Sequence, residues 1–287
     1  MFVQFIGLIA IFSFSTALQA AEFFRGASSS AMDQTGRAGI DSIEAAFLNP
    51  AILPRIKNTA MNAYYRDGSL LDAQHTTSMG LGVFDNTEDV YFPGGFHYLR
   101  LRETGVAAQP TAGEAWHGAV GYALSDRLSV GLSAYRLSHQ VGSDRFVQWN
   151  GALGLLLEVT PEILLAYVLD NPAHPGSEIP PRLREETLHS IGFLGSIMDV
   201  AKFRADISSQ ERDNPERKMV YRMGLETQNH EFFIVRVGFK RDQLHDQSLW
   251  SAGFCFNGPR LKVDYALEKN PEGASGALHS VDLRLPF

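Results

Sequence analysis

The sequence predicts an all-β protein: a transmembrane antiparallel up-and-down β-barrel of about 14 strands with an N-terminal plug segment. From Thr59 to Phe287, segments of about ten residues alternate apolar and polar side chains, and the joins between them alternate short and long. A stretch without alternation precedes them. Alternation is the period of a strand with two different faces. Alternating joins and an even strand number are typical of a membrane barrel.

Composition excludes several other classes. The chain has 287 residues, of which 45% are hydrophobic and 20% are charged, with a single cysteine. This balance argues against a disordered or disulfide-stapled protein. The formal net charge of -7 argues against a nucleic-acid partner, which would require a basic face. Beyond the extreme N-terminus, no apolar run approaches the roughly 20 residues of a membrane-spanning helix.

The first 20 residues read as a secretory signal peptide. They carry no charge, are rich in Phe, Ile and Leu, and end in small residues before Glu22. An uncleaved anchor helix is the alternative. Export suits the lone Cys255, because an oxidising compartment makes unpaired thiols a liability. We therefore divide the chain into a signal peptide (1–20), a plug segment (21–58) and a barrel (59–287).

Each strand is expected where the alternation holds, and turn-forming residues separate the strands. The segment 91–102 does not keep a single phase, and 163–169 is apolar on both faces. The expected strands are 59–67, 76–84, 91–102, 115–124, 128–138, 146–158, 163–169, 187–197, 200–208, 218–227, 231–240, 249–257, 260–268 and 277–287.

Charge segregates strictly between the two faces of the C-terminal segments. Alternate positions such as Phe233, Val235 and Val237 are apolar, whereas the opposite phase holds Arg236 and Lys240. A soluble secreted β-protein would hide the apolar face, whereas a barrel turns it toward outer-membrane lipid. The alternating joins favour the barrel. The sequence therefore predicts a location in the outer membrane of a Gram-negative bacterium.

Aromatic residues support this orientation. Several lie on the apolar phase near strand ends, where membrane barrels carry aromatic girdles. The chain ends in Phe287, and known outer-membrane barrels commonly end in an aromatic residue that the barrel-assembly machinery recognises. We therefore expect that machinery to be a partner. The girdle candidates are Trp116, Tyr122, Trp149, Tyr167, Tyr221, Trp250 and Tyr265.

The segment before the first strand carries a family resemblance. It contains Ser28-Ser29-Ser30, Gly36-Arg37-Ala38, an acidic stretch from Asp41 to Glu44, and Asn49-Pro50-Ala51 after a run of helical character from Ile40 to Leu48. These features resemble the leader of the long-chain fatty-acid outer-membrane transporter (FadL-like) family. Asp170-Asn171-Pro172 is similar to a recurrent feature of smaller members. Without the resemblance, Asn49-Pro50-Ala51 reads simply as a helix stop.

The resemblance implies a leader that plugs a fourteen-stranded barrel and a barrel that passes a hydrophobic small-molecule ligand, such as a fatty acid. Family members that move fatty acids carry large outer loops that form an apolar groove. Here the outer connections are polar and mostly of about six to seventeen residues. The alternative is a plugged barrel that acts as a structural or partner-binding component of an outer-membrane or secretion assembly.

Five cations on the polar phase are candidates for contact with a ligand head group. They are Arg222, Arg236, Lys240, Lys262 and Arg284. In the alternative interpretation they pair with Glu226, Asp264, Glu268 and Asp282 across strands and to the plug, without a ligand.

No enzyme is expected. His189-Ser190 and His279-Ser280 are adjacent on strands, so their side chains point to opposite faces and cannot form a dyad. The sequence has neither an HExxH motif nor a cysteine cluster, and it shows no cofactor motif.

Overall fold

The structure is a computed structural model that describes residues 25–287 except 41, 58, 72–73, 88, 106–110, 175, 181–182, 186, 199, 211–217, 244–245 and 272–275. The predicted signal peptide lies outside these residues. Within them the chain forms fourteen strands: β1 (Ala60–Leu71), β2 (Gln74–Asp85), β3 (Gly94–Gly105), β4 (Thr111–Ala123), β5 (Leu128–Val141), β6 (Asp144–Thr160), β7 (Ile163–Asp170), β8 (Leu188–Ile197), β9 (Ala201–Gln210), β10 (Met219–His230), β11 (Phe233–Asp242), β12 (Gln247–Asn257), β13 (Lys262–Lys269) and β14 (Leu278–Pro286).

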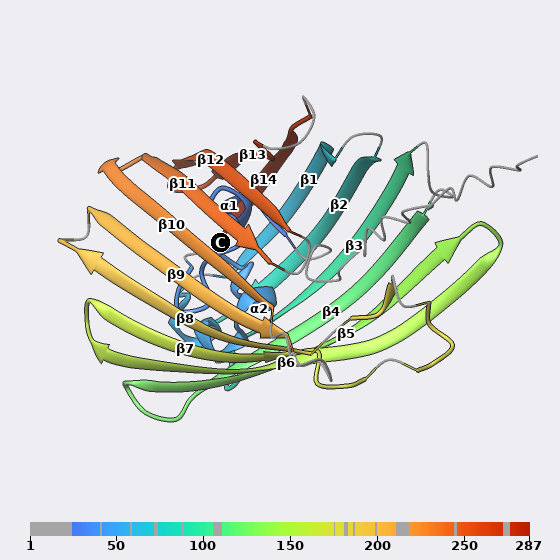
Figure 1. Cartoon of the computed structure of the whole chain (residues 1–287). Coiled ribbons are helices and arrows are strands. Elements are labelled where there is room, and N and C mark those ends of the chain that lie inside the picture. Colours follow the sequence, from blue (N-terminus) through green and yellow to red (C-terminus); the bar gives the residue numbers. More distant parts are fainter. Residues whose placement is uncertain are drawn as a thin grey trace, which may run out of the picture.

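The strands form one closed antiparallel barrel (Figure 1). Each strand pairs with its neighbours in sequence, and β1 closes the circle against β14, with Ala60 opposite Pro286 and Gly68 opposite Leu278. Closure leaves no unpaired edge, which is the condition for a sheet to cross a lipid bilayer. No helix among the described residues is long and apolar enough to do so. The predicted fold is confirmed.

Apolar side chains point outward and charged ones inward. On β11, Val235 is 52% exposed whereas Arg236 is 4% exposed. The same alternation holds on β14, where Val281 and Leu283 are exposed and Asp282 is buried. This is the predicted register of an outer-membrane-type barrel. The predicted girdle residues follow it, since Trp116, Trp149 and Trp250 are all exposed on the outer face.

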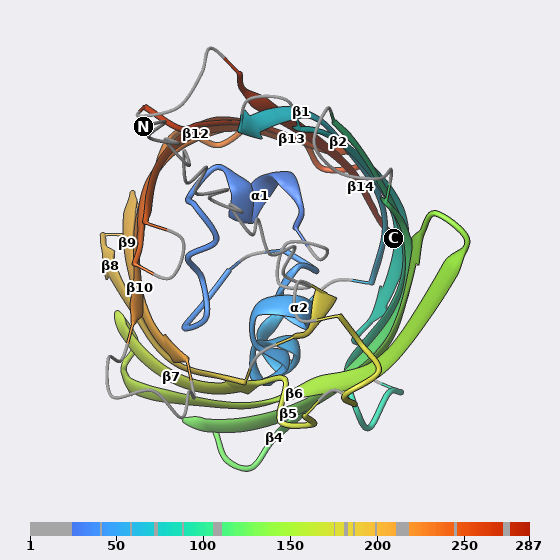
Figure 2. The same ribbon diagram turned by 45° about the vertical axis from the view of Figure 1, so that its right-hand side comes forward.

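The plug segment lies inside the barrel (Figure 2). It contains two short helices, α1 (Ala27–Ser30) and α2 (Ala45–Leu48), and a 3₁₀ helix, η2 (Pro50–Arg55). The helical run expected from Ile40 is therefore shorter than predicted, and α2 ends before Asn49 as the proline predicts. The chain continues as η2 because Pro50 occupies the first helical position, where its missing N–H is not needed.

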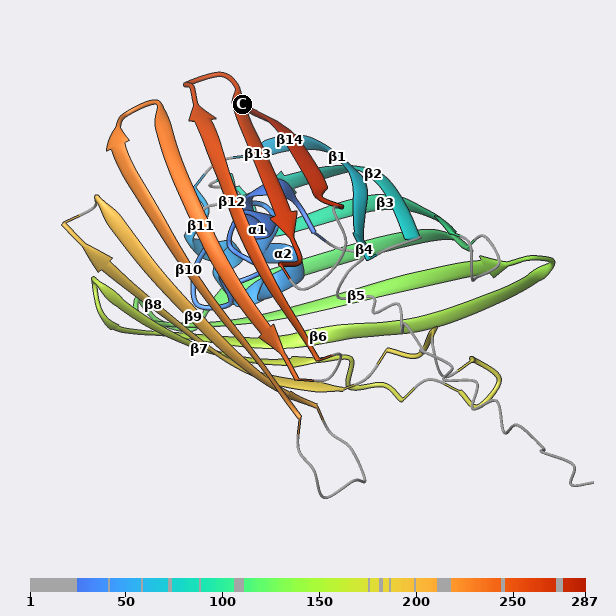
Figure 3. The same ribbon diagram turned by 45° about the horizontal axis from the view of Figure 1, so that its top comes forward.

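The strict alternation of short and long joins is not observed. At the end that was expected to carry long loops, β5 runs to Val141 and β6 starts at Asp144. The ladder continues into polar sequence beyond the apolar band, and Gly142 closes the turn with a φ of 60°. Figure 3 shows this hairpin projecting past the other strands. At the opposite end, the join 86–93 is longer than expected.

We call the end of the barrel where β1 starts and β14 ends the periplasmic end, because the turns there are mostly short. The other end is the outer end.

The plug explains why β7 is apolar on both of its faces. Ile163 and Leu165 face outward, while Leu164, Ala166 and Val168 are buried inside. Leu164 and Ala166 belong to a core that includes Ile40, Ile43 and Ile52 of the plug and Leu156 and Leu194 of the wall. The inner face of β7 is apolar because it packs against the plug rather than facing water.

Candidate functional site

A row of three glycines on the inner wall receives the 3₁₀ helix η2. Gly121 on β4 lies directly opposite Gly131 on β5, and Gly131 lies opposite Gly154 on β6. A Cβ atom at Gly131 would stand 2.2 Å from the carbonyl carbon of Pro50, and one at Gly121 would stand 2.6 Å from Cδ of Pro54. The wall is therefore smooth where the backbone of the plug touches it.

Asn49 joins the plug to the wall. Its side-chain oxygen accepts a hydrogen bond from the Ala51 N–H at 3.0 Å, which caps η2. Its Nδ2 donates to the carbonyl of Arg37 at 2.8 Å and to that of Leu155 on β6 at 3.3 Å. The side chain is fully buried. Asn49, Pro50 and Ala51 thus do more than stop a helix: they position η2 against the glycine row.

The acidic end of the predicted Asp41 to Glu44 stretch organises the start of the plug; Asp41 itself lies outside the described residues. The Glu44 carboxylate accepts hydrogen bonds from the backbone N–H groups of Gly26, Ser28 and Ser29 at 3.0–3.1 Å. Asp282 on β14 accepts from the Ala27 N–H at 2.8 Å. Two carboxylates therefore satisfy the donors that the first turn of α1 leaves unpaired.

Charged groups of the opposite wall hold the middle of the plug. Asp206 on β9 accepts from the Gly36 N–H at 3.0 Å and lies 3.5 Å from the Arg37 guanidinium. Arg204 donates to the carbonyl of Gly39 at 2.6 Å. The plug is therefore fixed by polar contacts on one wall and by close backbone packing on the other.

Among the described ionisable residues of the plug, Asp33 has the most strongly shifted pKa. Its side chain is completely buried and accepts a hydrogen bond from the Ser251 hydroxyl at 3.0 Å. Burial, with a smaller contribution from the Glu268 carboxylate, raises the pKa of Asp33 to about 7. Lys240, Ser251 and Arg25 act in the lowering direction.

Three of the five predicted lumen cations lie in the polar network of the barrel interior. Arg236 donates to Glu226 at 2.7 Å and to Asp264, Lys240 lies 3.6 Å from Asp242, and Arg222 donates to Ser208 at 2.9 Å. The Arg236 contacts match the alternative interpretation, which named Glu226 and Asp264 as partners, whereas Asp242 beside Lys240 and Ser208 beside Arg222 are residues that it did not name. The role of the three as head-group contacts stays a prediction.

The other two predicted cations, Lys262 and Arg284, line a cavity of about 400 Å³ at the periplasmic end. Arg284 also donates to Ser42 of the plug at 2.8 Å. Lys57 and Pro286 lie at the mouth of the cavity, beside the ends of the barrel chain. Much of the cavity wall is apolar: Ile40, Ile43, Ile52, Leu156, Leu164 and Leu194.

Among the described residues that line this cavity, every charged side chain is a cation. Besides Lys262 and Arg284, the lining contains Arg55, Lys57 and Lys202. Arg55 pairs with Glu158, Lys202 lies 3.8 Å from Glu226, and Arg284 lies 3.6 Å from Asp264. None of these three carboxylates is in the described lining of the cavity. An apolar chamber of this size with a few polar groups is typical of a small-molecule site. Its charge suits a hydrophobic ligand with an anionic group.

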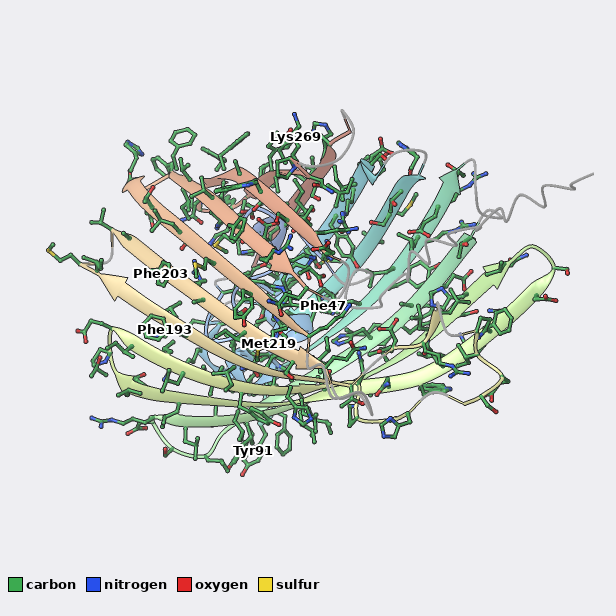
Figure 4. The ribbon with its side chains drawn as sticks, in the orientation of Figure 1. Phe47, Tyr91, Phe193, Phe203, Met219 and Lys269 are labelled. Atoms are coloured by element: carbon green, nitrogen blue, oxygen red, sulfur yellow. The ribbon has the colours of Figure 1, made fainter. Side chains whose placement is uncertain are left out.

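On the other side of the plug, an apolar cluster lies on the inner faces of β3, β4 and β5, with buried His97, His117 and His139 on the same faces. Leu99, Leu101, Ala115 and Leu137 are buried there with Tyr64 and Tyr135, and Phe47 of the plug packs against this group. The Phe47 ring lies 4.5 Å from His97 and 4.8 Å from His117, measured between ring centroids. Figure 4 labels Phe47 in the interior of the barrel. A small cavity of about 50 Å³ beside Phe47 reaches Tyr135 and Asp170.

The histidine-serine pairs are separated as predicted. His189 faces outward and bonds the Tyr167 hydroxyl at 2.7 Å, whereas Ser190 is buried and bonds Ser208 at 2.9 Å. His279 likewise contacts Tyr265 on the outer face. Neither pair forms a dyad.

A closed fourteen-stranded barrel with an internal N-terminal plug is the architecture of FadL-type outer-membrane channels, and solved structures of that type match this chain. The CymD monoaromatic hydrocarbon channel matches with a TM-score of 0.72 and 14% identity, over 91% of this chain and 97% of that one. The Ralstonia pickettii toluene transporter TbuX gives 0.68 and 14% over the same shares. A Pseudomonas aeruginosa FadL homologue gives 0.66 and 12%, over 91% and 98%.

These likenesses confirm the predicted FadL-like fold. They agree with the predicted outer-membrane location, which the outward apolar face supports independently. TbuX and CymD are described as a transporter and a channel. No family model matches the sequence, and a comparison with curated proteins finds no match.

Proposed function

We propose that this barrel passes a hydrophobic small molecule with an anionic group, such as a fatty acid, across the outer membrane, with the plug as its gate. The observation that supports this proposal is the periplasmic cavity, where an apolar wall meets five cations, the charged side chains of its described lining. An acyl chain would bury its surface against Ile43, Leu164 and Leu194, and a carboxylate would approach Lys262 and Arg284.

The apolar cluster on the inner faces of β3 to β5 supports a route from the outer end. A hydrophobic solute would meet Leu99, Leu101 and Leu137 before it reaches Phe47. The plug residues around Phe47 and Leu48 lie between that wall and the periplasmic cavity. Passage therefore requires this part of the plug to shift, whereas η2 can stay seated on the glycine row.

Two of the structural neighbours are a toluene transporter and a monoaromatic hydrocarbon channel. A neutral hydrocarbon is thus the competing substrate, and it would gain nothing from the cationic lining. Uptake of a labelled long-chain fatty acid and of toluene, measured in parallel, distinguishes the two.

The test uses cells that lack their own outer-membrane transporters for both solutes. Leu164→Trp places a bulky ring in the cavity, whereas Leu165→Trp, one residue away, faces lipid. We expect the native chain and Leu165→Trp to take up the fatty acid, and Leu164→Trp to lose at least about tenfold in rate. Absence of uptake by the native chain, or equal rates for the two variants, would contradict the proposal.

The projecting hairpin of β5 and β6 favours a second candidate, a plugged barrel that docks a partner in a surface or secretion assembly. Paired backbone continues to Val141 and Asp144, beyond the ends of the other strands (Figure 3). Ser143→Cys places a thiol for cross-linking at the exposed tip, while Cys255 is buried. One discrete cross-linked partner recovered from outer membranes would support this role, and recovery of lipid alone would oppose it.

A further inference from the structure

Four arginines face outward on one sector of the barrel wall, a position normally occupied by lipid-contacting residues. Arg100 and Arg102 on β3 and Arg145 on β6 are exposed, and Arg136 on β5 is half-buried. They share the outward phase with Phe96, Leu132 and Trp149. Charged side chains on this face are costly at the bilayer midplane and inexpensive near the head groups. Their level in the membrane therefore decides what they do.

The strand register places the patch at the outer boundary of the apolar band. Tyr98, Trp116, Arg136 and Trp149 lie opposite one another across β3 to β6. The Tyr98 and Trp116 rings are 4.6 Å apart between centroids, as members of an aromatic girdle. Arg102 lies four residues further toward the outer end, about 13 Å along the strand. Arg136 thus lies in the girdle row itself, and Arg100, Arg102 and Arg145 lie beyond it toward the outer end, at the depth of the outer-leaflet head groups.

The patch is wide enough for a glycolipid head group. Arg102, Ala112, Gln140 and Arg145 stand opposite one another, so the outer row spans three strand spacings, about 14 Å. Arg100, Arg102 and Gln140 also line a hollow of about 650 Å³ in the outer wall, together with Thr77, Met79 and Ala112. A concave, cationic surface with polar neighbours is a suitable receptor for phosphate groups.

Little within the protein neutralises this charge. Glu114 is the carboxylate opposite Arg100, and among the described residues no salt bridge joins them. Arg145 donates to the Ser138 hydroxyl at 2.8 Å, which orients it without cancelling its charge. At the outer end of β11, by contrast, Arg241 lies 2.6 Å from Asp246. The β3 to β6 sector therefore carries a net positive charge beside the head groups.

We propose that the outward arginines Arg100, Arg102, Arg136 and Arg145 form a binding site for the phosphate groups of a phosphorylated glycolipid of the outer leaflet. The acyl chains of that lipid would cover the apolar band beneath, along Leu81, Phe96 and Leu132, while the sugar phosphates occupy the hollow. Such a lipid would fix the height of the long β5 and β6 hairpin relative to the membrane surface.

The test is native mass spectrometry of the full chain in detergent, titrated with bisphosphorylated lipid A, with the same lipid after dephosphorylation, and with inorganic phosphate. Arg100→Gln/Arg102→Gln removes two cations of the patch. The control Arg241→Gln/Lys269→Gln removes two cations at the outer ends of β11 and β13. The retained barrel shift on unheated gels verifies folding. Should the first variant fail to fold, Arg136→Gln/Arg145→Gln carries the same expectation.

We expect a one-to-one adduct of lipid A with the native chain and the control, and at least about tenfold weaker binding by the patch variant and by dephosphorylated lipid. Equal binding of the two lipid forms, or equal binding by patch variant and control, would overturn the proposal. Inorganic phosphate that binds as tightly as lipid A would overturn the lipid as the ligand.

Discussion

Gly131 on β5 lies against Pro50 so closely that a Cβ atom on the glycine would stand 2.2 Å from the carbonyl carbon of the proline. No non-bonded carbon atoms approach to that distance. The wall of the barrel and the turn of the plug therefore fit only because this position has no side chain. That contact links the Asn49-Pro50-Ala51 segment of the sequence to one place in the lumen.

Gly131→Val should dislodge η2 from the wall. The added side chain must displace backbone rather than a flexible side chain, and such overpacking typically costs about 1–3 kcal/mol. We expect faster trypsin cleavage at Arg37 and Arg55 of the plug in the folded barrel. Gly118→Val is the matched control, because only one atom, at 4.0 Å, lies within reach of a Cβ there. Equal cleavage of the two variants would refute the seating of η2.

Asn49→Ala removes the cap of η2 and its two bonds to the carbonyls of Arg37 and Leu155. Each buried group left unsatisfied costs about 1–3 kcal/mol. Hydrogen exchange of the Ala51 amide should accelerate by at least about tenfold, while amides of β11 should be unchanged. Unaltered exchange at Ala51 would show that the side chain does not hold this turn.

Val235→Arg should impair membrane insertion, since a cation at the middle of the lipid face costs about 2–4 kcal/mol. Val235→Leu is the neutral control at the same site. The measurement is the folded fraction after refolding into lipid vesicles, read from gel mobility without heating. Normal folding of the arginine variant would contradict the outward register. Arg236→Val is not a neutral comparison, because it would remove the nearest cation from the buried carboxylates of Glu226 and Asp264.

The stability of the plug should depend on pH through Asp33. The pKa of this carboxyl in the folded chain, about 7, lies above its ordinary value of 3.8, so the folded state binds the proton more tightly. The contribution to the free energy of unfolding is therefore complete below about pH 4 and declines as the pH rises to about 7, by at most about 1.4 kcal/mol per unit. Asp33→Asn should flatten this decline, measured by urea unfolding across that range. A parallel decline in the variant would exclude Asp33 as its source.

Lys262→Gln should weaken the binding of a carboxylate-bearing ligand about tenfold, equivalent to about 1.4 kcal/mol, and leave a neutral hydrocarbon unaffected. The reason is that Lys262 contributes charge to the cavity, whose shape Ile43 and Leu194 determine. Isothermal titration with a fatty acid and with toluene measures both. A loss that is equal for the two ligands would indicate a steric effect instead.

The barrel could be predicted from the sequence because alternation is local: from Val235 to Lys240, the apolar residues face outward and the charged residues face inward. The strand ends were harder to predict. The backbones of β5 and β6 stay paired through a polar stretch of sequence in which the side chains do not alternate. The glycine row that contacts η2 was not predicted, for a different reason. Gly121, Gly131 and Gly154 all face inward, but their alignment in one row can be recognised only when the register of the three strands is known. The cationic cavity likewise assembles residues from both ends of the chain.

The most direct test of the account is the position of a bromine-labelled long-chain fatty acid in crystals of the full chain. We predict bromine density between Ile43, Leu164 and Leu194, with the carboxylate beside Lys262 and Arg284. Bromine found only in the lipid belt around the barrel, with the periplasmic cavity unchanged, would contradict the proposed passage.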